Sequence, residues 1–417
     1  MKAYESYKDS GIQWLPIIPS HWDSSKIKSH FRLRSIKVSD QDFPALSVSK
    51  NGVTPQLESA VKTDNGDNRK LVRAGDFVVN SRSDRKGSCG VSSLDGSVSL
   101  INIVLEPIDG YAQYYHHLFR SNDYIEEFYR NGRGIVSDLW TTRCDEMSSI
   151  MIPFPPIEEQ KKIVAFLAKQ ISLIETCKCQ RERELQTLNE LKKAEIASVV
   201  TRGLNPNVPM KDSGQIQFGE IPAHWDSVKM KYCFIQRSEK GFPNEPVLCA
   251  TQSKGVIPQS LYENRVVVVN KGFEGLKLVK VGDFVISLRS FQGGIEYAYY
   301  QGIISAAYTI LTPKDERNSQ YFKYLFKSHP FIQLLQTCVT GIREGQNINY
   351  AVLGNNFIPI PPIEEQNAIV EYIEAKTNSI DKMIDALKAE IDRLTEYKQR
   401  LISDVVTGQL NVQDEIA

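Results

Sequence analysis

Apolar residues recur at alternating steps of four and three near the end of the chain. They are Ile380, Ile384, Leu387, Ile391, Leu394, Leu401 and Val405, with Lys398 as a polar exception. This spacing is typical of a coiled-coil seam. A less regular stripe runs through Ile174, Leu185, Leu188, Leu191 and Val199, and there Lys178 and Arg181 fall on seam positions. Neither helix has a partner in its own segment, so we predict that the two pair as an antiparallel coiled coil.

The same signal precedes both helices. The first copy reads Pro155, Pro156, Ile157, Glu158, Glu159, Gln160, and the second reads Pro361, Pro362, Ile363, Glu364, Glu365, Gln366. Proline has a fixed φ and no N–H donor, which suits the entry to a helix, and glutamates in the first turn complement the helix dipole. These residues also form a candidate surface for docking a partner. The helix-start and docking interpretations are compatible.

Short β-type runs and turn residues fill the other segments. In the first, these are residues 77–79 and 99–105, followed by a predicted helix over 111–129. In the second, they are residues 265–269, 284–287 and 308–311, followed by a predicted helix near 319–336. Both segments are therefore predicted to be α/β or α+β domains built on a modest sheet.

The chain is an internal duplication. Residues 152–201 reappear without a gap as residues 358–407, and the segments around His21-Trp22-Asp23 and Gly75-Asp76-Phe77-Val78 also recur. A repeat of this size predicts a molecule with two-fold pseudo-symmetry. We expect globular domains at 1–152 and 205–358 and helical spacers at 153–204 and 359–417. The globular segments hardly resemble each other between these anchors, so one scaffold carries two different surfaces.

Composition places the chain among ordinary globular proteins, with 41% hydrophobic and 24% charged residues. It contains no apolar stretch of the roughly 20 residues that a membrane helix needs and no signal-peptide core, so we expect a cytoplasmic protein. Its seven cysteines lack metal-ligand spacing and are expected to be reduced. The net charge is zero, so any affinity for nucleic acid must come from local patches.

Several polar side chains could reach DNA from loops, and some of these loops follow a predicted strand. The candidates are Arg82, Arg85, Lys86, Arg130 and Arg133 in the first segment, and Arg289, Gln292, Arg343, Gln346 and Asn347 in the second. Reading base edges requires such side chains, with further cations on phosphates. Arg82 and Arg289 align, which indicates a shared role such as contact with phosphates. Taken singly, each candidate also fits an ordinary surface residue.

The repeated His-Trp-Asp segments allow two interpretations. His21 and His224 could be catalytic, but a tryptophan packed in a domain core and flanked by polar turn residues is the better explanation. The chain also lacks the GK[ST] phosphate loop, the F-x-G-x-G methyl-donor loop, the N/D-P-P-Y/F tetrad and H-E-x-x-H. The sequence thus favours a non-catalytic protein without a metal site.

The two Pro-Pro-Ile-Glu-Glu-Gln motifs, in register with two His-Trp-Asp and two Gly-Asp-Phe-Val segments, resemble the specificity subunit of type I restriction-modification enzymes. The resemblance covers essentially the whole chain. It implies two target recognition domains, each reading one half of a bipartite asymmetric site in double-stranded DNA, and paired helices that set the gap between the halves.

The resemblance also implies partners. The helices would dock two modification subunits, which methylate adenine with S-adenosylmethionine, and restriction subunits would add ATP-dependent cleavage with Mg²⁺. No cofactor is expected in this chain. Two alternatives remain open: a coiled-coil adaptor whose globular segments bind proteins, and a self-contained nuclease or methyltransferase.

Overall fold

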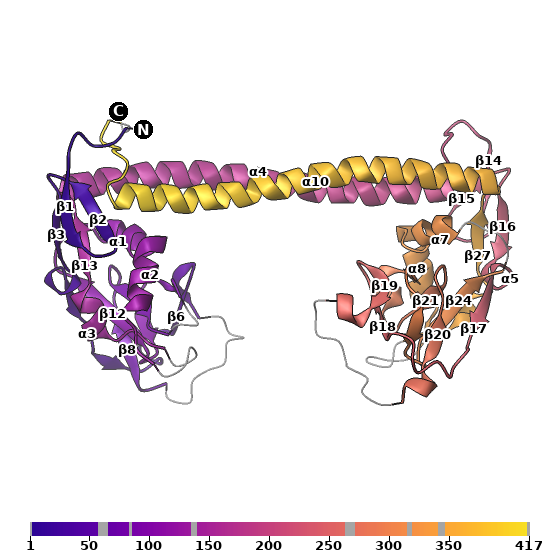
Figure 1. The fold of residues 1–417 in the computed structure, drawn as a ribbon, viewed down its shortest axis with the longest axis horizontal. Coiled ribbons are helices and arrows are strands. Elements are labelled where there is room, and N and C mark those ends of the chain that lie inside the picture. Colours follow the sequence, from indigo (N-terminus) through magenta and orange to yellow (C-terminus); the bar gives the residue numbers. More distant parts are fainter. Residues whose placement is uncertain are drawn as a thin grey trace. The chain divides into compact units, whose positions relative to one another are not determined.

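The chain folds into two compact units, which Figure 1 shows coloured along the sequence. This computed structural model describes residues 2–56, 66–82, 86–134, 140–262, 272–314, 319–340 and 347–414. Unit 1 combines residues 1–182 with residues 389–417, and unit 2 spans residues 183–388. Each of the two long helices therefore contributes one half to each unit. None of the described helices has the length and apolarity to cross a membrane.

Two antiparallel sheets form the centre of unit 1. The larger has the order β10 (Cys89–Val91), β9 (Phe77–Asn80), β12 (Asn102–Pro107), β4 (Phe31–Leu33), and the smaller has the order β11 (Gly96–Val98), β8 (Arg69–Val72), β5 (Lys37–Val38). Successive strand residues face opposite sides. Phe77 and Val79 accordingly pack into the main core, whereas Val78 packs with Val72 and Val98 in a second, smaller cluster.

Shorter strand pairs surround these sheets. They are β1 (Tyr7–Ile12) with β2 (Leu15–Pro19), β3 (Asp23–Lys26) with β13 (Met151–Phe154), and β6 (Leu46–Ser49) with β7 (Gly52–Pro55). The pairing of β3 with β13 joins the segment after Trp22 to the segment that enters the first long helix. The helix start is thus fixed to the globular part of unit 1.

Unit 2 repeats the plan. Its main sheet has the order β17 (Phe234–Arg237), β24 (Thr309–Pro313), β21 (Phe284–Ile286), β22 (Glu296–Tyr297). The pairs are β14 (Met210–Asp212) with β15 (Glu220–Pro222), β16 (Asp226–Lys229) with β27 (Phe357–Ile360), β18 (Leu248–Thr251) with β19 (Gly255–Pro258), β20 (Lys277–Val279) with β23 (Gly302–Ile304), and β25 (Val339–Thr340) with β26 (Asn347–Ile348). The strand expected at 265–269 lies outside the described residues. Both units confirm the mixed α/β class.

Each single helix expected in a globular segment is two helices. Unit 1 has α1 (Ala112–Leu118) and α2 (Asn122–Arg130), and unit 2 has α7 (Ser319–Leu325) and α8 (His329–Thr337). A serine stands at each break. Ser121 adopts an extended backbone and accepts a hydrogen bond from the Tyr124 N–H, which caps α2. Ser328 precedes α8 in the same conformation, and a proline occupies the first turn of α8.

Further short α-helices lie among the described residues of the globular parts. They are α3 (Cys144–Ser149) in unit 1 and α5 (Met230–Cys233), α6 (Ser290–Gly293) and α9 (Tyr350–Leu353) in unit 2.

The long helices α4 (Ile157–Arg202) and α10 (Ile363–Val406) pair antiparallel within each unit. In unit 1, Lys398 Nζ lies 2.6 Å from Glu175 Oε1 and Arg181 Nε lies 3.0 Å from Glu390 Oε1. In unit 2, Lys192 Nζ lies 2.6 Å from Asp381 Oδ1. The residue numbers of the paired side chains decrease along α10 as they increase along α4, which confirms the predicted antiparallel pairing.

The predicted α10 seam is confirmed, because Ile380, Ile384, Leu401 and Val405 are buried. The prediction for α4 was wrong at Leu191, which is 48% exposed. Its neighbour Lys192 turns toward α10 instead, because Asp381 offers an ionic partner there.

Candidate nucleic-acid interface

The two repeated motifs, His-Trp-Asp and Pro-Pro-Ile-Glu-Glu-Gln, contact each other in both units. In unit 1, Glu159 accepts a hydrogen bond from the Tyr4 hydroxyl at 2.6 Å, and His21 Nε2 lies 2.8 Å from its other oxygen. In unit 2, Glu365 Oε2 accepts from the Trp225 indole at 2.9 Å and lies 2.8 Å from His224 Nε2. The second glutamate of each motif therefore holds the globular part against the start of a long helix.

The tryptophans also contact the end of the other long helix. Gly203 and Gly408 follow α4 and α10 with left-handed φ angles of 74° and 76°. A Cβ added to Gly203 would lie 3.2 Å from the Trp225 ring, and one added to Gly408 would lie 3.0 Å from the Trp22 ring. Both tryptophans are fully buried, which confirms the core interpretation. Each links a helix end to the helix start beside it.

Other groups reinforce this junction. Gln160 donates to the Pro155 carbonyl and accepts from the Tyr111 N–H, both at 2.8 Å, and Gln366 donates to the Pro361 carbonyl at 2.8 Å. The hydroxyl of Tyr114 donates to Val406 O at 3.0 Å, and that of Tyr321 donates to Val200 O at 2.9 Å. Among the candidate docking residues, Pro155, Glu159, Gln160, Pro361, Glu365 and Gln366 thus serve internal contacts or are buried. Pro156, Glu158, Pro362 and Glu364 are exposed.

The Glu159 carboxylate predicts a pH dependence. Burial acts to raise its pKa, but hydrogen bonds from Tyr4, Gln413 and His21 outweigh burial and lower the pKa. A depressed folded-state pKa stabilises the fold above the unfolded pKa of roughly 4.3, and the effect is lost as the pH falls through the folded value. We expect Glu159→Gln to lower the melting temperature of unit 1 at pH 7, with a gap to wild type that narrows below about pH 4.

Calorimetric scans from pH 7 to pH 3 measure this gap. Glu158→Gln is the control, because Glu158 is exposed and pairs only with Lys161 of its own helix among the residues described. A difference in melting temperature between Glu159→Gln and wild type that stays constant with pH would contradict a lowered pKa of Glu159.

Four of the DNA-contact candidates of unit 1 lie close together. Arg82, which follows β9, and Arg133, which follows α2, both form β-bridges to Thr141. Arg130 ends α2 and pairs with Glu127, and Arg133 Nε lies 2.9 Å from Glu146. Lys86 Nζ lies 2.5 Å from Glu126 and 4.6 Å from the Tyr129 ring centre. Arg85 lies outside the described residues.

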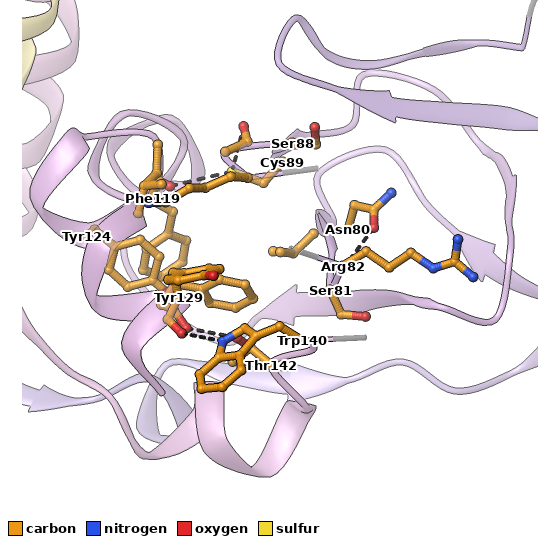
Figure 2. A pocket seen from close by; sticks show the side chains of 15 residues that line it. Asn80, Ser81, Arg82, Ser88, Cys89, Phe119, Tyr124, Tyr129, Trp140 and Thr142 are labelled. Atoms are coloured by element: carbon orange, nitrogen blue, oxygen red, sulfur yellow. Dashed lines mark hydrogen bonds between the residues drawn. The ribbon is translucent and has the colours of Figure 1, made fainter. Parts of the chain in front are cut away.

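Two of these cations, Arg82 and Lys86, border a hollow with aromatic walls, shown in Figure 2. Phe119, Tyr124, Tyr129 and Trp140 lie on one side of it, and Asn80 and Ser81 lie on the other. The Arg82 side chain extends away from the hollow. The Trp140 indole donates to the Tyr129 carbonyl at 2.9 Å, and the two rings lie 5.7 Å apart. Sequence reasoning found the cations but missed the hollow, because its walls come from four separate segments.

The candidates of unit 2 are more dispersed. Arg289 is exposed and precedes α6, which follows β21. Gln292 lines a groove with Gln252, Lys193, Lys327 and His329. Asn347 is exposed on β26, whereas Arg343 and Gln346 lie outside the described residues. The segment after the central strand therefore differs between the units. In unit 2 Arg289 leads into helix α6, whereas in unit 1 the aligned Arg82 forms a β-bridge to Thr141.

Each unit has a buried aspartate directly before the strand that leads to Arg82 or Arg289. Asp76 and Asp283 belong to the repeated Gly-Asp-Phe-Val segments and are 2% and 1% exposed. Asp76 lies 2.7 Å from Arg34 Nε, and Asp283 lies 3.0 Å from Arg237 Nε. Each also accepts a backbone N–H at 2.8 Å, from Arg73 or Lys280. The repeated aspartate was the sequence signal for this ion pair, but its arginine partner lies far earlier in the chain, 42 positions before Asp76 and 46 before Asp283.

Known proteins resemble this chain in sequence. Residues 222–393 match the family model of the type I restriction modification DNA specificity domain. A putative type I restriction enzyme MjaX specificity subunit of Methanocaldococcus jannaschii is 27% identical over 281 residues, which cover 64% of this chain and 61% of that protein. The MjaVIII specificity subunit of the same organism is 28% identical over 283 residues, covering 64% and 63%. The chain thus spans less than two thirds of these relatives.

Solved structures share the fold. The HsdS subunit of Thermoanaerobacter tengcongensis aligns with a TM-score of 0.52 and 19% identity over 94% of this chain and 98% of its own. A chain from a structure of complex assembly and conformational transition in the type I R-M system aligns with a TM-score of 0.68 and 16% identity over 94% and 99%. Together with the family-model match and the sequence relatives, this makes the chain similar, in sequence and in fold, to the specificity subunits of type I restriction-modification enzymes.

Proposed function

We propose that this chain is the DNA-reading subunit of a type I restriction-modification complex. Each globular part reads one half of a bipartite, asymmetric site in double-stranded DNA, and the paired helices set the gap between the halves. The chain itself carries out no chemistry. Its partners would be two modification subunits, which methylate adenine with S-adenosylmethionine, and restriction subunits, which use ATP and Mg²⁺.

One observation carries this proposal: a repeated scaffold presents two different surfaces. Both units bury the same tryptophan, hold a motif glutamate against a histidine, and bury the same aspartate beneath the central strand. The segments that follow this strand then diverge, with an aromatic hollow in unit 1 and helix α6 in unit 2. Unequal half-sites require unequal readers on equivalent supports, whereas a protein adaptor has no such requirement.

The exposed residues at the helix starts support the docking part of the proposal. Pro156, Ile157 and Glu158 are exposed, and so are their copies Pro362, Ile363 and Glu364. Ile157 is 42% exposed and Ile363 is 46% exposed. The same apolar residue, flanked by the same proline and glutamate, thus appears once in each unit. Two copies of one modification subunit would find equivalent contacts there.

Arg289→Ala should weaken DNA binding by the assembled complex on specific and non-specific duplexes alike. The Arg289 guanidinium is exposed and aligns with Arg82 of the other unit, as expected of a phosphate contact. Losing one phosphate contact should reduce the slope of log K against log salt by about 0.9. Titration with labelled duplexes at several salt concentrations measures this slope.

Lys376→Ala is the matched control, because Lys376 is an exposed cation of unit 2 on α10. It should leave the slope unchanged. An Arg289→Ala complex with the wild-type slope, or a loss confined to one sequence, would reject the phosphate role.

The whole proposal is tested by methylation sequencing of a host that carries this gene and a neighbouring modification gene. We expect N6-methyladenine in a split motif with a fixed gap, and we expect the motif to vanish when this gene is deleted. An unchanged methylome, with both proteins expressed, would favour the adaptor alternative.

A further inference from the structure

The hollow of unit 1 contains a small cavity between the central sheet and α2. Val79, Cys89, Phe119, Tyr124 and Phe128 contribute its apolar lining. Its volume is about 20 Å³. A cavity needs roughly 10–15 Å³ on this measure to admit one water molecule, so this space fits a single small group such as a methyl.

One residue that lines the cavity, Tyr124, carries a buried polar group without a partner among the described residues. Tyr124 is 2% exposed, and its hydroxyl has no hydrogen-bond partner among the described residues. A buried hydroxyl without a partner costs folding free energy. Nearby, the Cys89 thiol contacts the Phe119 carbonyl at 3.5 Å. An occupant that combined an apolar group with an adjacent hydrogen-bond acceptor would therefore match both the space and the Tyr124 hydroxyl.

The rim of the cavity has the charge that a DNA ligand requires. Arg82 lines the hollow with its backbone end, and its exposed side chain extends away from the hollow, where it could meet a neighbouring phosphate. Lys86 also lines the hollow; it is partly exposed, pairs with Glu126 and lies beside Tyr129. Cations around an apolar recess complement a nucleic acid, in which phosphates flank the base edges.

Unit 2 differs at the equivalent positions. By the alignment that pairs Arg82 with Arg289, Tyr124 corresponds to Phe331, which has no hydroxyl, and Cys89 corresponds to Glu296. Glu296 is buried and pairs with Lys327 at 2.6 Å. Helix α6 packs against α8, and Phe291 of α6 contacts the core. The residues that line the recess of unit 1 are therefore replaced at the equivalent described positions of unit 2, as expected of a feature that distinguishes two half-sites.

We propose that this cavity receives the C5 methyl group of one thymine in the half-site read by unit 1. Among the major-groove edges, thymine presents a methyl group beside an acceptor, O4. The methyl would fill the apolar space and O4 would accept from the Tyr124 hydroxyl. This inference rests on the proposed function, and it predicts that the half-site contains a thymine.

Uracil substitution tests the methyl contact. Once the methylation motif is known, each thymine of both halves is replaced singly by deoxyuridine, and the affinity of the assembled complex is measured. Burying one methyl group contributes about 0.8 kcal/mol, so one position should show a loss of about four-fold. Cys89→Met extends a flexible side chain into the cavity and should abolish the preference for thymine at that position alone. Thymine preferences in the other half should persist.

Tyr124→Phe tests the hydroxyl separately. Both thymine and uracil carry O4, so this variant should weaken binding to both duplexes equally and keep the four-fold ratio. A half-site without thymine, uracil substitutions without effect, or a Cys89→Met complex that keeps the wild-type ratio would each overturn the proposal. Failure to bind any split site would instead reject the proposed function. The two failures are therefore distinguishable.

Discussion

Trp225→Ala is expected to destabilise unit 2 by about 3–5 kcal/mol, the usual cost of truncating a fully buried tryptophan. Trp225 is 0% exposed and contacts both Gly203 after α4 and Glu365 at the start of α10. The loss should therefore concentrate at these helix ends. Hydrogen exchange of peptides from residues 196–203 and 363–373 measures it.

Trp22→Ala is the matched control, because Trp22 has the same place in unit 1. It should accelerate exchange in the part of α10 before Gly408 and leave residues 196–203 protected. Equal acceleration in both units by either variant would show that the tryptophans do not act within their own units.

Asp283→Asn should destabilise the main sheet of unit 2 by about 3 kcal/mol. Asp283 accepts from the Lys280 N–H at 2.8 Å, from Arg237 Nε at 3.0 Å and from the Thr312 hydroxyl at 2.6 Å. An amide would leave the largely buried Arg237 without its buried counter-charge, and breaking a buried ion pair typically costs 3–5 kcal/mol. Exchange protection of β21 and β24 should fall accordingly.

Glu239→Gln is the control on the same arginine. Glu239 lies 2.6 Å from Arg237 Nη1 but is 48% exposed, and exposed ion pairs contribute less than about 1 kcal/mol. Equal losses in the free energy of unfolding from Asp283→Asn and Glu239→Gln would show that the buried ion pair of Arg237 is no more stabilising than the exposed one.

The long helices were the most predictable part of the fold. Regular apolar spacing fixed the α10 seam, and the polar exception Lys398 is explained by Glu175 on the facing helix. The same reasoning misplaced Leu191, because periodicity cannot show that Asp381 would draw Lys192 into the seam. Where a charged residue has a partner across the interface, apolar spacing alone is insufficient.

The globular parts were predicted less well. A run of helix-forming residues hid the breaks at Ser121 and Ser328, since a serine becomes a cap only when the chain before it turns. The cations after the central strand were found from residue type and position. The cavity beside them was not, because Val79, Cys89 and Tyr124 meet only through sheet pairing and helix packing. Sequence thus suggests which polar residues to consider, whereas recesses depend on tertiary contacts.

The divided course of the long helices has a consequence for biosynthesis. Unit 2 is continuous from residue 183 to residue 388, whereas unit 1 needs residues 389–417 as well. Leu401, Val405 and Val406 belong to its core, and Lys2 pairs with Asn411. Domains generally fold as they leave the ribosome, N-terminal first. Here unit 1 is completed after unit 2, so its apolar surface stays exposed until residues 389–417 have left the ribosome.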